Sequence, residues 1–194
     1  MDGPGKNVKR ALVTGAGGTL GAELCRELLG RGFSVIGVDR DEDAGMRLEA
    51  EFARETGPFR FRPLDVGVAD EWGLLADELH ADHLGLALLV NAAGMLVTGP
   101  LADIPEVALI RSIQVNLLGT ILGCRACLGL LSAADDDGGR ILNIASCNAF
   151  LPIPWSAAYN ASKAGVVAFS RTLAAELMES NVRVTVVCPG FFAS

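Results

Sequence analysis

Aromatic residues and positive charge are scarce in this 194-residue sequence, which has one tyrosine, two histidines and a net charge of −7. A nucleic-acid partner requires a basic surface, so the acidic balance argues against one. No apolar run reaches the length of a membrane span, and the polar first ten residues lack the apolar centre of a signal peptide. We therefore expect a cytoplasmic protein without a membrane partner.

A disulfide framework is also missing. The five cysteines are odd in number and mostly lie within apolar runs, at Cys25, Cys124, Cys127, Cys147 and Cys188. This placement is typical of reduced, buried thiols. Cys124 and Cys127 have the spacing of a redox motif, but they lie within a predicted helix rather than at a strand-to-helix junction. His80 and His83 have no cysteine nearby, so no metal site is predicted.

The residues that are present favour a globular α/β protein of one domain, residues 1–194, since 51% are hydrophobic and 20% are charged. Strands are expected at Val8–Thr14, Phe33–Val38, Phe59–Pro63, Leu86–Asn91, Arg140–Ala145 and Val182–Cys188. Helices are expected at Leu20–Arg31, Asp41–Thr56, Val68–His83, Pro105–Leu131 and Ala157–Leu177. This alternation predicts a doubly wound parallel sheet of Rossmann type with about six strands, in three layers.

A glycine-rich loop, Thr14 to Gly21, follows the first strand and opens the first helix. Gly15 permits a tight turn there, and Gly21 allows the helix to pack closely on the strand. The free amides at the start of the helix, together with its dipole, suit a pyrophosphate group. The loop therefore predicts a dinucleotide site.

An acidic residue, Asp39, ends the second strand. A carboxylate at this position accepts hydrogen bonds from the ribose hydroxyls of an adenosine and repels a 2′-phosphate, which favours NAD over NADP. Arg40 follows it, and a guanidinium is suited to that phosphate, so NADP is the alternative. A further alternative is that Asp39 caps the next helix.

Tyr159 and Lys163 are four residues apart in a predicted helix, so their side chains lie on one face. An ammonium near a phenol favours the phenolate, which can exchange a proton with an alcohol or a carbonyl near neutral pH. Ser146 ends the preceding strand, at the carboxyl edge where doubly wound sheets bind ligands. The alternative for an isolated pair of this spacing is an ordinary surface contact.

Together these features resemble the short-chain dehydrogenase/reductase family over nearly the whole chain. The resemblance rests on Thr14-Gly15-x-x-x-Thr19-x-Gly21, Asn91-Ala-Ala-Gly94, Asn116, Ser146, Tyr159-x-x-x-Lys163 and Pro189-Gly190, in that order. It implies an NAD(P)-dependent oxidoreductase that transfers hydride between nicotinamide and a secondary alcohol or ketone. The implied partner is a small hydroxyl or carbonyl substrate.

The resemblance also implies catalytic roles. Tyr159 would exchange the hydroxyl proton, and Lys163 would favour its phenolate and hydrogen-bond the nicotinamide ribose. Ser146 would hydrogen-bond the substrate oxygen as its charge changes. Asn116 resembles an asparagine that supports a water-linked proton relay; its alternative is a buried asparagine that caps backbone groups.

Further positions would hold the dinucleotide. Asn91 resembles a residue that braces the central sheet, and Gly94 one that lets adenosine approach. Asp65 and Val66 resemble the pair that contacts adenine. The other implied cofactor positions are Gly15, Gly17, Thr19, Leu20, Gly21, Asp39, Arg40, Ala92, Ala93, Tyr159, Lys163, Pro189, Gly190 and Ser194.

Three departures from the family pattern are visible. Thr19 replaces the middle glycine of the phosphate loop, a change that we expect to be tolerated, and Ala92 stands where a second asparagine is common. The chain also ends at Ser194, directly after the sixth strand, whereas family members continue through a substrate-covering segment and a last strand. We therefore expect a shortened chain with an uncovered pocket and an open sheet edge. The alternative function is an impaired fragment that binds the dinucleotide or a partner without turnover.

The residues expected near the substrate are mostly apolar, which suggests a hydrophobic substrate. They are Met95, Leu96, Val97, Phe150, Leu151, Ile153 and Trp155. Family members usually associate through helices that correspond to Pro105–Leu131 and Tyr159–Leu177. We therefore expect a homo-oligomer, with a dimer across those two faces.

Overall fold

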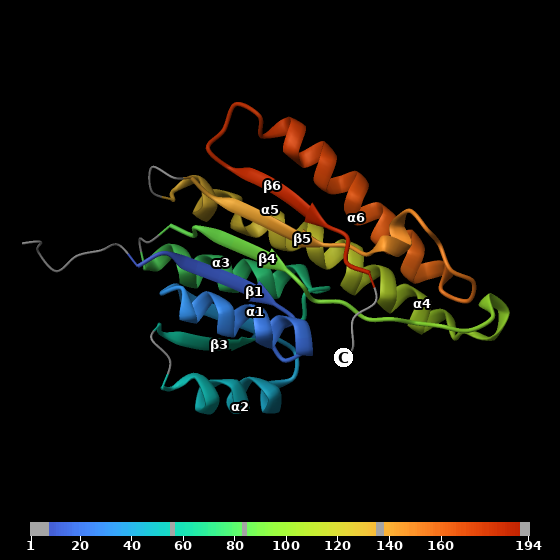
Figure 1. Ribbon diagram of the computed structural model, residues 1–194, viewed down its shortest axis with the longest axis horizontal. Coiled ribbons are helices and arrows are strands. Elements are labelled where there is room, and N and C mark those ends of the chain that lie inside the picture. Colours follow the sequence, from blue (N-terminus) through green and yellow to red (C-terminus); the bar gives the residue numbers. More distant parts are fainter. Residues whose placement is uncertain (1–7, 55–56, 83–84, 135–137, 191–194) are drawn as a thin grey trace, which may run out of the picture.

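The computed structural model describes residues 8–54, 57–82, 85–134 and 138–190. Within them, six parallel strands form one sheet in the order β3-β2-β1-β4-β5-β6 (Figure 1). The strands are β1 (Arg10–Thr14), β2 (Ser34–Asp39), β3 (Phe59–Pro63), β4 (Leu88–Asn91), β5 (Arg140–Ile144) and β6 (Arg183–Val187). The predicted doubly wound parallel sheet is confirmed.

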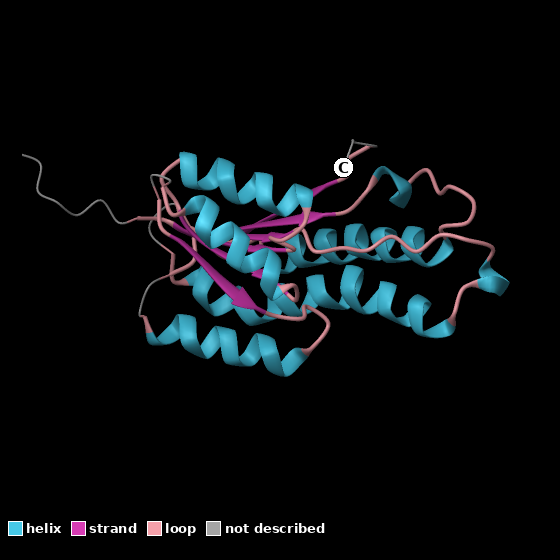
Figure 2. Cartoon of the chain, turned by 90° about the horizontal axis from the view of Figure 1, so that it is seen from below, coloured by secondary structure: helices cyan, strands magenta, loops and turns pink. Residues whose placement is uncertain are grey.

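Helices cover both faces of the sheet, which gives three layers (Figure 2). One face packs against α1 (Thr19–Gly30) and α2 (Glu42–Phe52). The other packs against α3 (Ala69–Ala81), α5 (Gly119–Ser132) and α6 (Ala157–Glu176). A further α-helix is α4 (Glu106–Ile113), and 3-10 turns form at η1 (Leu101–Asp103) and η3 (Cys147–Ala149).

Most predicted boundaries differ from the observed ones by one or two residues. The largest difference is at α2, which ends at Phe52 rather than Thr56. Ala53 is the C-cap of this helix, and the chain continues as a turn over residues 53–54. The predicted helix ends at Thr56 and His83 lie outside the described residues.

The long helix predicted over Pro105–Leu131 is a continuous helical stretch, but it is not a regular α-helix. A π-helical turn, η2 (Gln114–Leu118), separates α4 from α5. At this turn, the Thr120 hydroxyl donates to the Asn116 carbonyl oxygen at 3.0 Å. Hydrophobic periodicity does not signal a π turn, although such turns are frequent at functional sites.

The same stretch, Glu106–Ser132, is long and apolar enough to cross a membrane by length and composition alone. The prediction that no segment reaches this length is therefore wrong by that measure. Cys124, Cys127, Leu130 and Leu131 on its inner face are buried in the core that α3 and the sheet also form. The apolar residues of this face thus serve core packing.

The two largest apolar cores among the described residues lie on opposite faces of the sheet. The larger core contains Trp72 of α3, whose indole N–H donates to the Val66 carbonyl oxygen at 3.0 Å. The smaller core contains Phe52 of α2, whose ring meets that of Phe59 edge-on. Every residue of β1 is buried, as expected for a central parallel strand.

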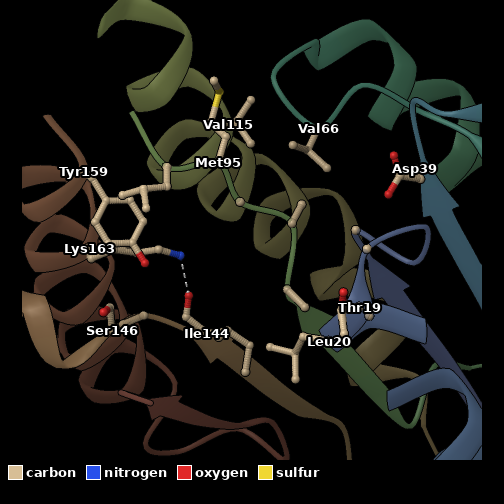
Figure 3. A pocket seen from close by; sticks show the side chains of 18 of the residues that line it. Thr19, Leu20, Asp39, Val66, Met95, Val115, Ile144, Ser146, Tyr159 and Lys163 are labelled. Atoms are coloured by element: carbon tan, nitrogen blue, oxygen red, sulfur yellow. Dashed lines mark hydrogen bonds between the residues drawn. The ribbon is translucent and has the colours of Figure 1, made fainter. Parts of the chain in front are cut away.

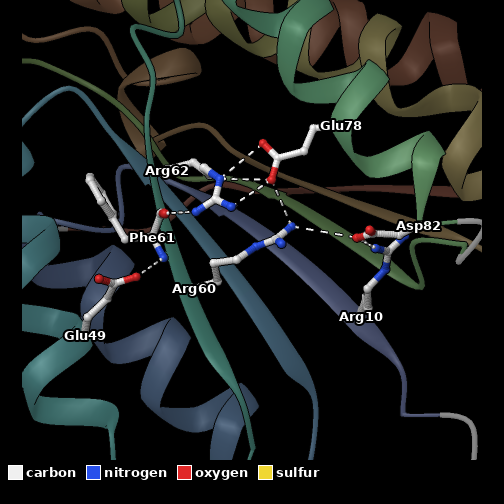
Figure 4. Close-up of polar contacts among 7 residues, drawn as sticks. All are labelled: Arg10, Glu49, Arg60, Phe61, Arg62, Glu78 and Asp82. Atoms are coloured by element: carbon white, nitrogen blue, oxygen red, sulfur yellow. Dashed lines mark hydrogen bonds and ion pairs between the residues drawn. The ribbon is translucent and has the colours of Figure 1, made fainter.

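Charged side chains gather between β3 and α3 at one border of the sheet (Figure 4). Arg62 donates to Glu78 at 2.8 and 3.0 Å, and further charged partners are Arg10, Arg60 and Asp82. On the edge of β3, the Phe61 N–H donates to the Glu49 carboxylate at 2.9 Å. The Phe61 carbonyl oxygen accepts from Arg62 at 2.8 Å. Side chains thus occupy the two backbone groups of Phe61.

Candidate active site

A cleft of about 520 Å³ opens at the carboxyl ends of the strands. It lies where β1 is flanked by β2 on one side and by β4 on the other, so successive connections leave in opposite directions. Doubly wound sheets bind their ligands at this switch point. The glycine-rich loop lines one part of the cleft, and Ser146, Tyr159 and Lys163 line another (Figure 3).

The glycine-rich loop has the conformation that its sequence predicts. Gly15 has a φ of +70°, and a β-carbon there would lie 2.7 Å from the Ala93 Cα. A β-carbon on Gly21 would lie 2.0 Å from the Gly15 carbonyl oxygen, so this close packing requires glycine. Gly18 precedes α1 without a side-chain cap, and Thr19 faces the cleft. The first amides of α1 can therefore bind an anionic group.

Asp39 ends β2 on the side of the cleft opposite Tyr159 (Figure 3). Its carboxylate accepts from the Gly17 N–H at 3.0 Å and from the Asp41 N–H at 3.1 Å. The side chain that caps α2 is that of Asp41, so Asp39 is not the helix cap. Asp39 and the exposed Arg40 both line the cleft and remain the two residues that bear on cofactor choice.

Tyr159 and Lys163 lie in the first two turns of α6 and point into the cleft (Figure 3). The Lys163 ammonium donates to the Ile144 carbonyl oxygen at 2.8 Å and lies 5.8 Å from the centre of the Tyr159 ring. Ser146 follows β5, and its hydroxyl accepts from the Asn148 N–H at 3.2 Å. A phenol, an ammonium and a hydroxyl thus meet in one region of the cleft.

Lys163 is only 5% exposed, and burial lowers the pKa of its ammonium to about 8. The nearby Cys188 thiol acts in the opposite direction, but burial dominates. At neutral pH the Lys163 ammonium is therefore mostly protonated, although it is shielded from bulk water. A cation in such surroundings favours negative charge on a neighbouring oxygen.

Asn116 lies in the π turn and is fully buried. Its Oδ1 accepts from the Met95 N–H at 2.8 Å, and its Nδ2 donates to the Met95 carbonyl oxygen at 2.9 Å. Nδ2 also donates to the Ser162 hydroxyl at 3.1 Å, and Ser162 donates to the Tyr159 carbonyl oxygen at 2.7 Å. This is the geometry of an asparagine that caps backbone groups; a proton relay through this turn stays a prediction.

Asn91 lies behind the wall of the cleft and is 3% exposed. Its Nδ2 donates to Asn143 Oδ1 at 2.8 Å, and Asn143 donates to the Ser170 hydroxyl at 2.9 Å, which joins β4, β5 and α6. At the end of β1, the Thr14 hydroxyl accepts from the two amides that follow Asn91, at 3.0 Å each. These bonds brace the strand ends under the cleft, in keeping with the role predicted for Asn91.

Most of the predicted site residues line this single cleft. They are Gly15, Thr19, Leu20, Gly21, Asp39, Arg40, Asp65, Val66, Ala92, Ala93, Gly94, Ser146, Tyr159, Lys163, Pro189 and Gly190. Gly17, Asn91 and Asn116 do not line it and act through their contacts with other residues. Ser194 lies outside the described residues.

Sequence reasoning missed other lining residues, above all Arg111 and Val115 of the long helix and Ile144 of β5. Ile144 was within reach of prediction, because it stands at the carboxyl end of a strand two residues before Ser146. Arg111 and Val115 had no such signal, since helical periodicity alone does not say which face meets a cleft.

The apolar residues expected near the substrate fall into two groups. Met95 and Leu96 line the cleft. The other five do not line it: Val97, Phe150, Leu151, Ile153 and Trp155. Of these, Phe150, Leu151 and Trp155 are 62%, 72% and 70% exposed. The predicted apolar pocket wall is therefore partly an apolar surface beside the cleft.

Cys124 and Cys127 are both buried free thiols. Burial raises the pKa of the Cys124 and Cys127 thiols to about 12, and reactive cysteines have the opposite shift. In the part of the chain that the structure describes, no three His, Cys, Asp or Glu side chains are grouped so as to hold a metal ion.

The switch point of a parallel sheet thus carries an anion-accepting loop, and a phenol beside an ammonium faces it across the cleft. This combination defines a dehydrogenase of Rossmann type. A family model described as short chain dehydrogenase matches residues 9–194. The chain belongs to that family, as its ordered motifs predicted.

Proteins with similar sequences and structures are named dehydrogenases and oxidoreductases. The cyclopentanol dehydrogenase of Comamonas sp. (strain NCIMB 9872) is 34% identical over 97% of this chain, which covers 74% of that protein. The crystal structure of an NAD⁺-bound xylitol dehydrogenase superposes with a TM-score of 0.89 at 28% identity, over 96% of this chain and 71% of the other. A metagenomic short-chain oxidoreductase in complex with NADP superposes with a TM-score of 0.87 at 32% identity, over 95% and 83%.

Proposed function

We propose that this protein is an NAD-dependent alcohol dehydrogenase of the short-chain family, acting on a secondary alcohol or its ketone. The observation that carries the proposal is the convergence of Tyr159, Lys163 and Ser146 in a cleft whose opposite side presents Asp39. The glycine-rich loop fits a dinucleotide, because the first amides of α1 have no side-chain cap and can bind an anionic group. Gly15 and Gly21 permit the close backbone packing that gives the loop its shape.

The residues divide the chemistry between them. When bound, the nicotinamide ring supplies the hydride acceptor or donor. In alcohol oxidation, Tyr159 takes the hydroxyl proton while the carbinol hydrogen leaves as hydride, and in reduction the same phenol returns the proton. Ser146 donates to the substrate oxygen, and the buried Lys163 ammonium favours the phenolate. Asn116 holds the Met95 backbone beside them.

The choice of NAD rests on Asp39. Its carboxylate is already oriented by the Gly17 and Asp41 amides, and it lines the cleft where it can accept from ribose hydroxyls and repel a phosphate. Fluorescence titrations with NADH and NADPH in parallel test this choice. We expect NADH to bind about tenfold tighter, the effect of one hydrogen bond to a charged group. Tighter NADPH binding would transfer the deciding role to Arg40.

The substrate that we propose is hydrophobic. Met95 and Leu96 line the cleft, and the exposed Phe150 and Trp155 lie outside it. The name of the Comamonas relative points to a cyclic apolar alcohol, whereas the xylitol enzyme points to a polyol. Comparing kcat/KM for cyclopentanol and xylitol decides between them, and faster turnover of xylitol would reject the proposal.

We further propose a homodimer through α4 and α6. Leu101, Val107, Ile110 and Ile113 leave an apolar surface on η1 and α4, next to Ala158 of α6. Exposed apolar patches of this kind mark interaction surfaces. Light scattering at micromolar concentration should give twice the chain mass, and Ile110→Asp should give the monomer. A monomeric wild type would exclude this dimer.

Location in the cytoplasm also stays a prediction.

A further inference from the structure

Arg111 lies on α4 outside the motifs that carry the family resemblance, yet it lines the cleft. Its guanidinium donates to Asp65 Oδ2 at 2.6 Å, and the two side chains are only 23% and 25% exposed. Asp65 follows β3, so the pair connects two segments that are 46 residues apart in the sequence.

The Asp65 carboxylate is held from a second side as well. The Gly67 N–H donates to its Oδ1 at 2.9 Å, and the Asp65 N–H donates to Glu71 at 2.6 Å. Burial opposes ionisation of Asp65, but the hydrogen bonds from Arg111 and Gly67 outweigh it and keep its pKa below the ordinary value. The carboxylate is therefore fixed in both orientation and charge.

The loop that carries Asp65 is also seated on the long helix. A β-carbon on Gly67 would lie 3.0 Å from the Arg111 guanidinium, and one on Gly119 would lie 2.7 Å from the Val66 side chain. These close approaches leave little freedom for the loop itself. Arg111 is thus the side chain that decides how Asp65 is presented to the cleft.

An ionised carboxylate only accepts hydrogen bonds, and it has about four lone-pair sites, two of which Arg111 and Gly67 use. Since Asp65 lines the cleft near Asp39, the remaining sites suit a ligand group that donates. The exocyclic amino group of adenine is such a donor. A carbonyl at the same place would face the carboxylate with two acceptors opposed, which is unfavourable when both are desolvated.

We propose that Arg111 is a positioning residue for base recognition: by holding the Asp65 carboxylate, it lets the cleft select a base with an amino group over one with a carbonyl. This inference rests on the proposed function, because it takes the ligand to be a dinucleotide whose base lies at the Asp65 end. Arg111 acts through Asp65 and makes no contact with the reacting atoms.

The test compares the binding of NADH with that of reduced nicotinamide hypoxanthine dinucleotide, in which a carbonyl replaces the amino group. We expect the wild type to bind NADH about tenfold tighter, and Arg111→Met to reduce this preference to about twofold or less. Arg111→Lys keeps the charge without the planar fork and should retain part of the preference. Arg125→Met, at an exposed arginine on α5, is the matched control and should keep the full preference.

Three results would overturn the inference. One is an Arg111→Met protein with the wild-type preference, and another is a wild type that binds both dinucleotides equally. The third is a further loss when Arg111→Met is added to Asp65→Asn, because a residue that acts through Asp65 has no effect without it. If Arg111→Met does not fold, Arg111→Lys decides, and an unchanged preference overturns the role. A wild type that binds neither dinucleotide rejects the proposed function itself.

Discussion

The two halves of the sheet differ in how completely they are covered. The strands β1 and β2 are covered on both faces. Helices α1 and α2 pack on one face, and α3 packs on the other as part of the larger core. Every residue of β1 is buried. At β6, Val184 and Val186 face the core and α6, whereas Arg183, Thr185 and Val187 are exposed. Within residues 8–54, 57–82, 85–134 and 138–190, no helix covers that face of β6 (Figure 1).

The residues proposed to bind the nucleotide and those proposed to exchange the proton lie in different halves of the sheet. The covered half carries the glycine-rich loop and Asp39, whereas Ser146 and Tyr159 follow β5 and begin α6 on the side of the open half. Exposed Phe150 and Trp155 lie in the segment between them. We therefore expect nucleotide affinity to depend mainly on the first region, and the rate of hydride transfer to depend mainly on the second, which holds the residues proposed to exchange the proton.

The largest effect is expected from a substitution that removes the proposed proton-exchanging group beside β5 and β6 and leaves the region around β1 and β2 unchanged. Tyr159→Phe keeps the ring but removes the proton-exchanging hydroxyl, so kcat should fall by about a thousandfold. The Kd for NADH should change by less than about twofold, because a phenol oxygen contributes at most one hydrogen bond. Steady-state kinetics and fluorescence titration measure the two quantities. Comparable losses of both would show that the halves do not act separately.

Two tryptophans allow the packing of the two regions to be compared directly. Trp72→Ala removes a side chain that is 2% exposed and its hydrogen bond to Val66, so the free energy of unfolding should fall by about 4 kcal/mol. Trp155→Ala removes a 70% exposed side chain and should cost less than about 0.5 kcal/mol. Urea denaturation measures both. Equal costs would contradict the difference in coverage.

A third prediction concerns how completely Lys163 is shielded from water in the folded chain. Because burial lowers the pKa of Lys163 from 10.5 to about 8, the folded chain binds fewer protons than the unfolded chain between these values. Its stability without ligand should therefore rise with pH across this window, by about 3 kcal/mol in total. Below pH 8 the lysine is protonated in both states, so its contribution is constant there.

Lys163→Met is the control, because it lacks the titrating group and should not show this gain. The quantity to follow is the difference in unfolding free energy between the two proteins from pH 7 to pH 10.5, which cancels the other groups that titrate. A constant difference across this range would mean that Lys163 is hydrated in the folded chain, and it would contradict the burial that lowers its pKa.

The smallest expected effect is a gain. Trp155 has a φ of +65°, a left-handed conformation that a bulky residue adopts at a cost, and Gly99 donates to its carbonyl oxygen at 2.8 Å. Trp155→Gly should raise the free energy of unfolding by about 1 kcal/mol. Trp155→Ala keeps a β-carbon and should show no such gain. Thermal unfolding of the two variants measures the contrast, and equal midpoints would exclude the strain.

The fold could be predicted from the sequence because its strands are short apolar runs separated by helical tracts. Phe59–Pro63 was predicted to the residue, and the other strands to within two. Much of the cleft was predictable for a related reason. In a parallel sheet, residues that follow strands meet at one edge, so Gly15, Asp39 and Ser146 converge although the chain separates them widely.

The features that could not be predicted depend on contacts between distant segments. The π turn, η2, leaves no trace in the apolar spacing of the long helix. The Arg111–Asp65 pair requires two elements to be placed before its distance is known. The left-handed Trp155 departs from the local preference of its residue type, and only the surrounding loop contacts define it.

The occupied backbone of Phe61 affects how copies of the chain can aggregate. A foreign strand that pairs with β3 would have to displace Glu49 from the Phe61 N–H and Arg62 from its carbonyl oxygen. Within the described part of the chain, the opposite border of the sheet is β6, where Val187 is 39% exposed. Intermolecular sheet growth, the first step toward fibrils, should therefore be disfavoured at the β3 border.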